Sequence, residues 1–185
     1  MNIDFNYKIL SNFNVESIEQ KIFSLKKSDW EIYNYRQKNN TVHKYTKTIP
    51  ILYDEEYSIY RGKESKFYKL FKEDIDSLEY LLSKVYEEKG EIIRAVLVNL
   101  PAGNYVKRHY DRSRETFKIH PRVHLPIITN PDVSFIIEDE NFFMKQGTLY
   151  EINNNNKLHG VYNNSTQDRI HLILDWKAHN ITGLL

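Results

Sequence analysis

After Gly90 the sequence is a succession of short segments rich in β-branched and aromatic residues, separated by turn-forming residues. Segments of this length and composition are typical of β-strands. The Pro, Gly and Asn residues between them are typical of turns. The expected strands are Ile92–Leu100, Tyr105–His109, Arg122–Ile128, Val133–Ile137, Thr148–Ile152, Leu158–Tyr162 and Arg169–Trp176. Short strands in this spacing predict a sandwich, a jelly roll or a barrel.

The first half of the chain is expected to contain both helices and extended segments, and it includes the clearest helical pattern of the sequence. Apolar residues recur every three or four positions over Glu64–Lys89, and Gly90 lies where such a helix would end. A second helix is expected over Asn14–Leu25, and extended segments over Trp30–Tyr35 and Thr48–Tyr53. We therefore expect one domain over residues 1–185, with a mixed α/β layer at 1–90 packed on a β core at 91–177.

The composition excludes several classes of function. The 185 residues include no cysteine, which rules out disulfides, iron–sulfur clusters, zinc–thiolate sites and cysteine nucleophiles. Lys and Arg total 26 against 25 for Asp and Glu, and this net charge of +1 argues against a nucleic-acid partner. The chain has no apolar run long enough for a signal peptide or a membrane span, so we expect a soluble, cytoplasmic protein with no membrane partner.

Three residues of the β half could form a metal site. His109 and Asp111 are two residues apart, so on one extended strand both side chains project to the same face. His159 lies near the start of another expected strand. Two imidazoles and one carboxylate form the facial arrangement that suits non-haem Fe(II) and leaves coordination positions open. Taken singly, each of these histidines could instead be structural or merely exposed.

Two arginines on other expected strands accompany this set. Arg169 could reach into the barrel and bind a carboxylate through two parallel hydrogen bonds, or it could be a surface residue at a sheet edge. Arg122 and His124 again project to one face of a strand. If that face is the barrel interior, Arg122 needs an anionic partner, which could be an oxo acid, a substrate carboxylate or Asp111. Alternatively, His124 is a core histidine and Arg122 an exposed charge.

The order of the motifs HYD (109–111), RVHLPIITN (122–130), GTLYEINN (147–154), HGVYN (159–163) and DRIHLILDW (168–176) resembles that of the aspartyl/asparaginyl β-hydroxylase-like branch of the Fe(II)/2-oxoglutarate oxygenases. The resemblance covers residues 90–177. It implies a mainly β fold with α-helices, a double-stranded β-helix of the jelly-roll, cupin-like type with N-terminal helices packed on one sheet. The segment 112–120 looks longer than the corresponding loop of the β-hydroxylases.

The resemblance also implies roles for the residues named above. His109 and His159 match the iron-binding histidines, and Asp111 matches the acid of the wider superfamily. Arg169 matches the arginine that binds the distal carboxylate of 2-oxoglutarate. Arg122 and His124 match an R-x-H motif that contacts cosubstrate or substrate. No catalytic side chain is expected beyond this metal centre.

The implied activity is that of an Fe(II)- and 2-oxoglutarate-dependent dioxygenase. Such an enzyme uses O2 to hydroxylate an unactivated C–H bond of a small molecule, such as a free amino acid, or of a peptide side chain, and releases succinate and CO2. One alternative is a non-catalytic, cupin-like metal- or ligand-binding sensor, and another is a β-sandwich interaction module. The intact set of His109, Asp111, His159 and Arg169 favours the enzyme. The substrate, the carbon attacked and the oligomeric state stay open.

Overall fold

The structure of the protein, a computed structural model, describes residues 5–55, 60–111 and 120–179. The helices in this part of the chain are α1 (Glu16–Ser24), α2 (Tyr35–Asn39) and α3 (Tyr68–Val85), with two short 3-10 helices, η1 (Lys27–Trp30) and η2 (Thr41–His43). The strands are β1 (Tyr7–Asn12), β2 (Lys47–Tyr53), β3 (Lys63–Glu64), β4 (Gly90–Leu100), β5 (Tyr105–His109), β6 (Arg122–Ile128), β7 (Val133–Ile137), β8 (Glu140–Phe142), β9 (Thr148–Ile152), β10 (His159–Asn163) and β11 (Arg169–Ala178).

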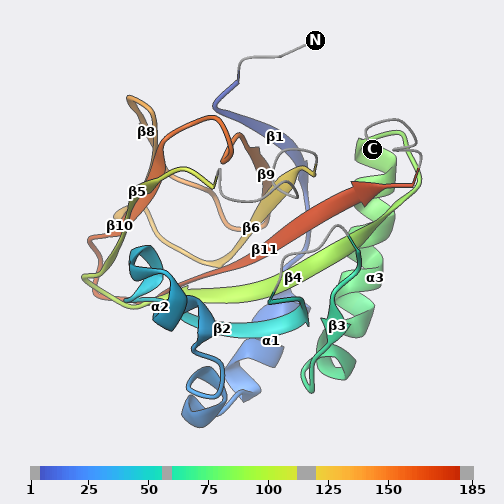
Figure 1. Cartoon of the computed structure of the whole chain (residues 1–185), viewed down its shortest axis with the longest axis horizontal. Coiled ribbons are helices and arrows are strands. Elements are labelled where there is room, and N and C mark those ends of the chain that lie inside the picture. The colour runs from blue at the N-terminus through green and yellow to red at the C-terminus, as the bar shows by residue number, and fades with distance from the viewer. Residues whose placement is uncertain (1–4, 56–59, 112–119, 180–185) are drawn as a thin grey trace.

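These strands form two antiparallel sheets between which the chain passes back and forth (Figure 1). The larger sheet has the order β1-β9-β6-β11-β4-β2-β3, and the smaller sheet has the order β5-β10-β7-β8. From β4 onwards, consecutive strands alternate between the two sheets, apart from the β7–β8 hairpin. This winding is that of a double-stranded β-helix, so the prediction of a mainly β, jelly-roll fold with N-terminal helices on one sheet is confirmed.

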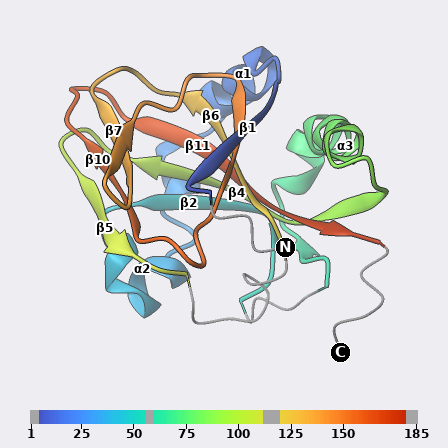
Figure 2. The same cartoon turned by 90° about the horizontal axis from the view of Figure 1, so that it is seen from above.

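Helices α1 and α3 cover one face of the larger sheet, while the smaller sheet and α2 lie on its other side (Figure 2). Ile18 of α1 and Leu78 of α3 are fully buried in the main core, together with Leu97 of β4. A separate apolar cluster that includes Leu100 and Phe135 lies between the two sheets. The helices therefore anchor the larger sheet from outside and leave its inner face available for a site.

The central strand β11 contributes side chains to both faces of the larger sheet, because side chains alternate along a strand. Ile170, Leu172 and Leu174 belong to the core beneath the helices. Arg169 and Asp175 are also buried, but they lie on the inner face of the sheet. The structure thus settles the face of Arg169, which the sequence pattern left open.

The strands expected after Gly90 all form, and four of them have the expected bounds. The helix α3 begins at Tyr68 rather than Glu64, because Lys63 and Glu64 pair with β2 as the short strand β3. Gly90 is the first residue of β4 and not the end of the helix. A Cβ atom at Gly90 would lie only 2.4 Å from the Lys177 carbonyl oxygen, so glycine permits the close approach of β11.

The expected extended segment Trp30–Tyr35 is wrong. Trp30 ends the 3-10 helix η1, and Tyr35 begins α2. The Asp29 side chain accepts a hydrogen bond from the Lys26 backbone N–H (3.0 Å) and so favours the turn over an extended chain. Ile32 is 59% exposed, so the apolar alternation of this segment has no buried face to support a strand.

We expect the contact between α3 and the sheet to be a main source of stability. Leu78→Ala should lower the free energy of unfolding by about 2–5 kcal/mol, because it removes a fully buried side chain and leaves a cavity. The same substitution at Leu70 of this helix, where 38% of the residue is exposed, should cost less than about 1 kcal/mol. Urea denaturation measures both values, and equal losses would contradict this account of the core.

Candidate functional site

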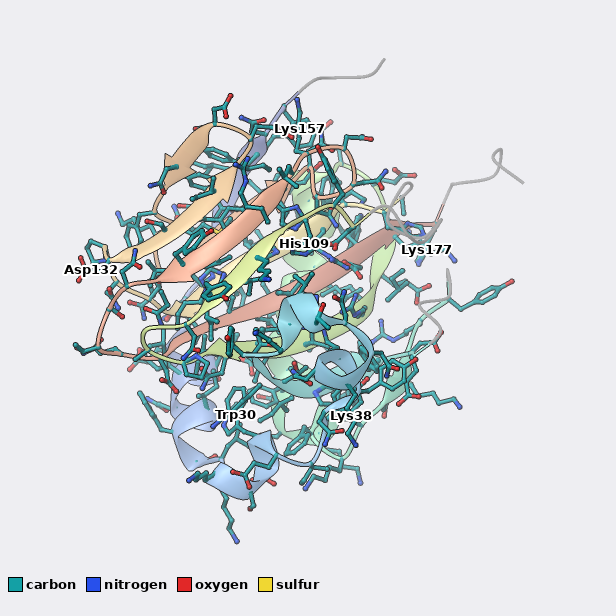
Figure 3. The ribbon with its side chains drawn as sticks, turned by 60° about the vertical axis from the view of Figure 1, so that its left-hand side comes forward. Trp30, Lys38, His109, Asp132, Lys157 and Lys177 are labelled. Carbon is teal, nitrogen blue, oxygen red and sulfur yellow. The ribbon has the colours of Figure 1, made fainter. Side chains whose placement is uncertain are left out.

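His109, Asp111 and His159 lie together at the ends of two paired strands of the smaller sheet. His109 is the last residue of β5 and lies opposite His159, the first residue of β10, with ring centroids 4.4 Å apart. One possible ligand atom from each of the three residues lies within 4.8 Å of the other two. Figure 3 shows His109 in the middle of the view, between Asp132 on one side and Lys177 on the other. The structure therefore brings the three expected metal ligands together inside the fold.

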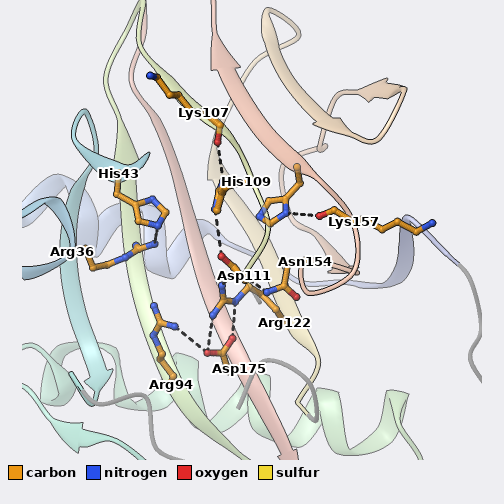
Figure 4. Close-up of polar contacts among 11 residues, drawn as sticks. Arg36, His43, Arg94, Lys107, His109, Asp111, Arg122, Asn154, Lys157 and Asp175 are labelled. Atoms are coloured by element: carbon orange, nitrogen blue, oxygen red, sulfur yellow. Dashed lines mark hydrogen bonds and ion pairs between the residues drawn. The ribbon is translucent and has the colours of Figure 1, made fainter. Parts of the chain in front are cut away.

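Both histidines present the same ring nitrogen to this site. The Nδ1 atom of His109 donates a hydrogen bond to the Lys107 carbonyl oxygen (2.8 Å), and Nδ1 of His159 donates to that of Lys157 (3.1 Å) (Figure 4). Because a carbonyl oxygen can only accept, Nδ1 of each ring is the donor, and Nε2 is the nitrogen left for the site. Burial lowers the pKa of His159 to about 4, so its ring is neutral near pH 7, as a metal ligand must be.

Asp111 lies just beyond the end of β5, and contacts from outside the smaller sheet fix its position. Its Oδ1 atom is 3.4 Å from Nε2 of His109. Its Oδ2 atom accepts hydrogen bonds from Nη1 of Arg122 and from Nδ2 of Asn154 (2.8 Å). The Asp111 backbone N–H also donates to the Asn154 carbonyl oxygen (3.0 Å). Burial alone would raise the pKa of Asp111, but the Arg122 guanidinium holds it well below its usual range, so the carboxylate stays ionised.

Arg122 lies on the inner face of β6 and joins two buried carboxylates. Besides Asp111, it binds Asp175 of β11 through Nε (2.8 Å) and Nη2 (3.1 Å). Asp175 accepts a further hydrogen bond from Nη1 of Arg94 (3.2 Å). Burial would raise the pKa of Asp175, but Arg122 and Arg94 together lower it. Of the anions expected for Arg122, the structure contains Asp111 and adds Asp175, which the sequence pattern did not single out.

Arg169 is the first residue of β11 and is 2% exposed. Its Nη2 atom is 2.5 Å from Nδ1 of His171, and its Nε atom is buried without a hydrogen-bond partner. Among the described residues no carboxylate pairs with Arg169, and burial alone lowers its pKa to about 9. A buried, unpaired guanidinium is costly, and an anionic ligand would relieve this cost.

His124 lies beside this group on the inner face of β6. Its ring is 5.7 Å from that of Phe135 and 5.9 Å from that of His171, measured between centroids. Its Nδ1 atom is buried and without a partner, and burial holds the pKa of His124 well below its usual range. The neutral ring can therefore offer one donor and one acceptor to a bound molecule.

One cavity connects the metal-ligand candidates with Arg122, His124 and Arg169. Its remaining polar wall comes from the N-terminal half: Arg36 of α2, His43 of η2 and Thr46. Nη2 of Arg36 is 3.3 Å from Nε2 of His43, whose ring meets that of His109 edge-on. The sequence alone assigned no role to these residues, nor to Asn154 and Asp175 within the motifs GTLYEINN and DRIHLILDW, because their roles depend on contacts between segments far apart in the chain.

The residues around this cavity fit Fe(II) and 2-oxoglutarate. Two imidazoles and an ionised carboxylate are the donor set that suits a facial Fe(II) site, and such a set leaves positions open for further ligands. The unpaired Arg169 guanidinium at the same cavity suits a second carboxylate, such as the distal one of 2-oxoglutarate.

The comparisons with known proteins agree with this arrangement. The model of the aspartyl/asparaginyl β-hydroxylase family matches residues 7–179. The structure is similar to that of a 2OG-Fe(II) oxygenase family oxidoreductase from Burkholderia pseudomallei, with a TM-score of 0.66 and 13% identity over 95% of this chain and 85% of that one. It is also similar to a Pseudomonas putida prolyl-4-hydroxylase, with a TM-score of 0.55 and 10% identity over 95% and 94% of the two chains. At such identities the likeness shows a shared fold. A search of the curated proteins found no match.

The family match confirms the resemblance inferred from the sequence motifs. It confirms the prediction of a hydroxylase that depends on Fe(II), 2-oxoglutarate and O2, and it favours this enzyme over the two non-catalytic alternatives. None of the helices in the described part of the chain is long and apolar enough to cross a membrane.

The support that Asn154 gives to Asp111 can be tested through metal affinity. Asn154→Ala removes the hydrogen bond to Oδ2 of Asp111 and should weaken Fe(II) binding about 10- to 100-fold, as is usual for a residue that orients a metal ligand. Asn156→Ala, at an exposed position of the same loop, should leave the affinity unchanged. Anaerobic calorimetric titration measures both constants, and equal affinities would show that Asn154 does not orient the ligand.

Proposed function

The chain belongs to the aspartyl/asparaginyl β-hydroxylase family, and we propose that it hydroxylates an unactivated C–H bond of a small molecule, such as a free amino acid, or of a peptide side chain. In this reaction one oxygen atom of O2 enters the product as the new hydroxyl group. The other enters succinate, which forms from 2-oxoglutarate with release of CO2. The observation that carries the proposal is that three metal-ligand candidates and an unpaired, buried arginine share one cavity.

His109, Asp111 and His159 are the proposed iron ligands. Hydrogen bonds at Nδ1 orient the His109 and His159 rings, and a hydrogen bond from Asn154 orients the Asp111 carboxylate. Bound Fe(II) supplies the activation of O2, which no side chain of the protein can perform. The three protein ligands leave the remaining coordination positions for small ligands.

Arg169 is the proposed anchor for the distal carboxylate of 2-oxoglutarate. Its burial and its lack of a carboxylate partner among the described residues support this role. A guanidinium binds a carboxylate in a fixed, planar geometry and would therefore orient the cosubstrate as well as hold it.

Arg122 and His124 are proposed to contact cosubstrate or substrate from the neighbouring strand. Arg122 also keeps Asp111 ionised and in place, which makes it a positioning residue for the metal site. His124 lies beside it as a hydrogen-bond donor. The apolar part of the cavity wall would limit the access of water to the reacting groups; it is formed by Val98, Val106, Phe135, Val161 and Ile173.

A turnover assay tests the proposal. The Fe(II)-loaded protein should release succinate from 2-oxoglutarate under air, and one or more members of a panel of free amino acids and short peptides should raise this rate. Mass spectrometry of the stimulating compound should find a gain of one oxygen atom. Failure of every compound to gain oxygen would contradict the substrate proposal, and failure to convert 2-oxoglutarate at all would contradict the enzyme.

The anchor role of Arg169 predicts a selective loss of cosubstrate affinity. Arg169→Ala should weaken 2-oxoglutarate binding by roughly 10- to 150-fold, because it removes a hydrogen bond between charged groups. Metal affinity should stay nearly the same. Arg108→Ala, at an exposed position of β5, serves as the control and should leave both affinities unchanged. Unchanged 2-oxoglutarate affinity in Arg169→Ala would show that the anchor lies elsewhere.

Arg122→Met should affect stability and activity together. Removal of the guanidinium leaves the buried Asp111 carboxylate without its arginine partner and Asp175 with Arg94 alone, so the free energy of unfolding should fall by about 3–5 kcal/mol. At a temperature where the variant is fully folded, substrate-coupled succinate release should still be reduced. Arg94→Met breaks a pair with Asp175 but not with Asp111, and it should turn over normally once folded. Normal turnover by folded Arg122→Met would restrict Arg122 to a role in folding.

A further inference from the structure

Arg122 and Arg169 both lie on the inner face of the larger sheet, but they are held in different ways. Arg122 is bound by the carboxylates of Asp111 and Asp175, so its charge is compensated within the protein. Arg169 is held by an imidazole, that of His171, two residues along the same strand. The difference follows from the register of β11: Arg122 lies opposite Asp175, whereas Arg169 lies opposite Leu100 of β4.

The contact with Arg169 determines the protonation of His171. A guanidinium can only donate, so Nδ1 of His171 accepts the hydrogen bond and carries no proton. The proton of the neutral ring is then on Nε2, which is buried and has no partner among the described residues. Burial, followed by the charge of Arg169, holds the pKa of His171 well below its usual range, so the ring stays a neutral acceptor near pH 7.

A neutral acceptor orients a guanidinium without cancelling its charge. A carboxylate in the same position would fix Arg169 equally well, but it would also form a buried ion pair with it. An incoming dicarboxylate would then have to displace that internal anion. With His171 in this place, the charge of Arg169 is available to a ligand, and the geometry of the guanidinium is already set.

We propose that His171 is a positioning residue that orients Arg169 and preserves its charge, and that it thereby makes the site selective for oxo acids with a second, distal carboxylate. The inference rests on the proposed role of Arg169 in binding 2-oxoglutarate. Buried nitrogens of Arg169 (Nε), His171 (Nε2) and His124 (Nδ1) all lack partners and lie in neighbouring side chains. Such a concentration of unsatisfied groups is costly in the free protein and is expected where a polar ligand binds.

The test compares two ligands that differ only at the distal end. 2-Oxoglutarate has the second carboxylate, and 2-oxopentanoate has a methyl group in its place. Binding of each is measured by calorimetry with Mn(II) in place of Fe(II) and without O2, so that no turnover occurs. Wild-type protein should prefer 2-oxoglutarate.

Three variants separate orientation from charge. His171→Asp should pair with Arg169 and weaken 2-oxoglutarate binding about 100-fold. His171→Leu removes the acceptor and should weaken it about 10-fold. His171→Asn, whose side-chain oxygen can accept from Arg169, should stay within about 3-fold of wild type. Affinity for 2-oxopentanoate should be the same in all four proteins, which also establishes that the cavity and the metal site are intact.

The outcomes are distinct. If His171→Asp keeps the wild-type preference for 2-oxoglutarate, the inference about His171 is wrong while the proposed function stands. An equal loss of both ligands would show that His171 supports the whole pocket, and this too would overturn the inference. If wild-type protein itself fails to distinguish the two oxo acids, the role of Arg169 in the proposed function fails, and the inference fails with it.

Discussion

The bridge that Arg122 forms between Asp175 and Asp111 connects the core of the protein to its site. Asp175 belongs to β11, the central strand of the larger sheet, whereas Asp111 lies beyond the end of β5 in the smaller sheet. In the described part of the chain Asp111 lies beyond the strand pairing of β5, and a backbone hydrogen bond to Asn154 holds it there, so Arg122 and Asn154 determine where its carboxylate lies. The geometry of the metal-ligand candidates therefore depends on a buried charge network as much as on the strands.

One face of β11 packs in the core and the other faces the cavity, and the register of this strand determines which side chains lie on each face. Ile170, Leu172 and Leu174 pack beneath the helices, while Arg169, His171 and Asp175 face the cavity side. A shift of one residue would exchange these sets, placing charges in the apolar core and aliphatic groups at the site. Burial of the apolar face thus also fixes the polar face. This explains how a cavity lined by ionisable groups can persist inside a stable sheet.

The sequence predicted the local structure of the β half well, because strand formation there follows from composition and turn residues. It predicted the segment Trp30–Tyr35 wrongly, since alternation over a few residues does not reveal whether a sheet edge is available. Asn154 and Asp175 lie within the motifs that carry the family resemblance, but the sequence assigned them no role for a related reason. An asparagine in a run of asparagines, or an aspartate late in a strand, has no local feature that reveals a partner on another strand.

By itself the sequence determined which segments are strands, which side chains share a face, and which residue types could bind a metal or an anion. These properties are local, since they follow from the two-residue period of an extended chain and from side-chain chemistry. Only the tertiary structure decided which charges are compensated. Arg122 and Arg169 look alike in the sequence, but the strand register sets one opposite an aspartate and the other opposite a leucine. Electrostatic pairing depends on distances across strands, and so only the fold shows that Arg169 is buried without a carboxylate partner among the described residues.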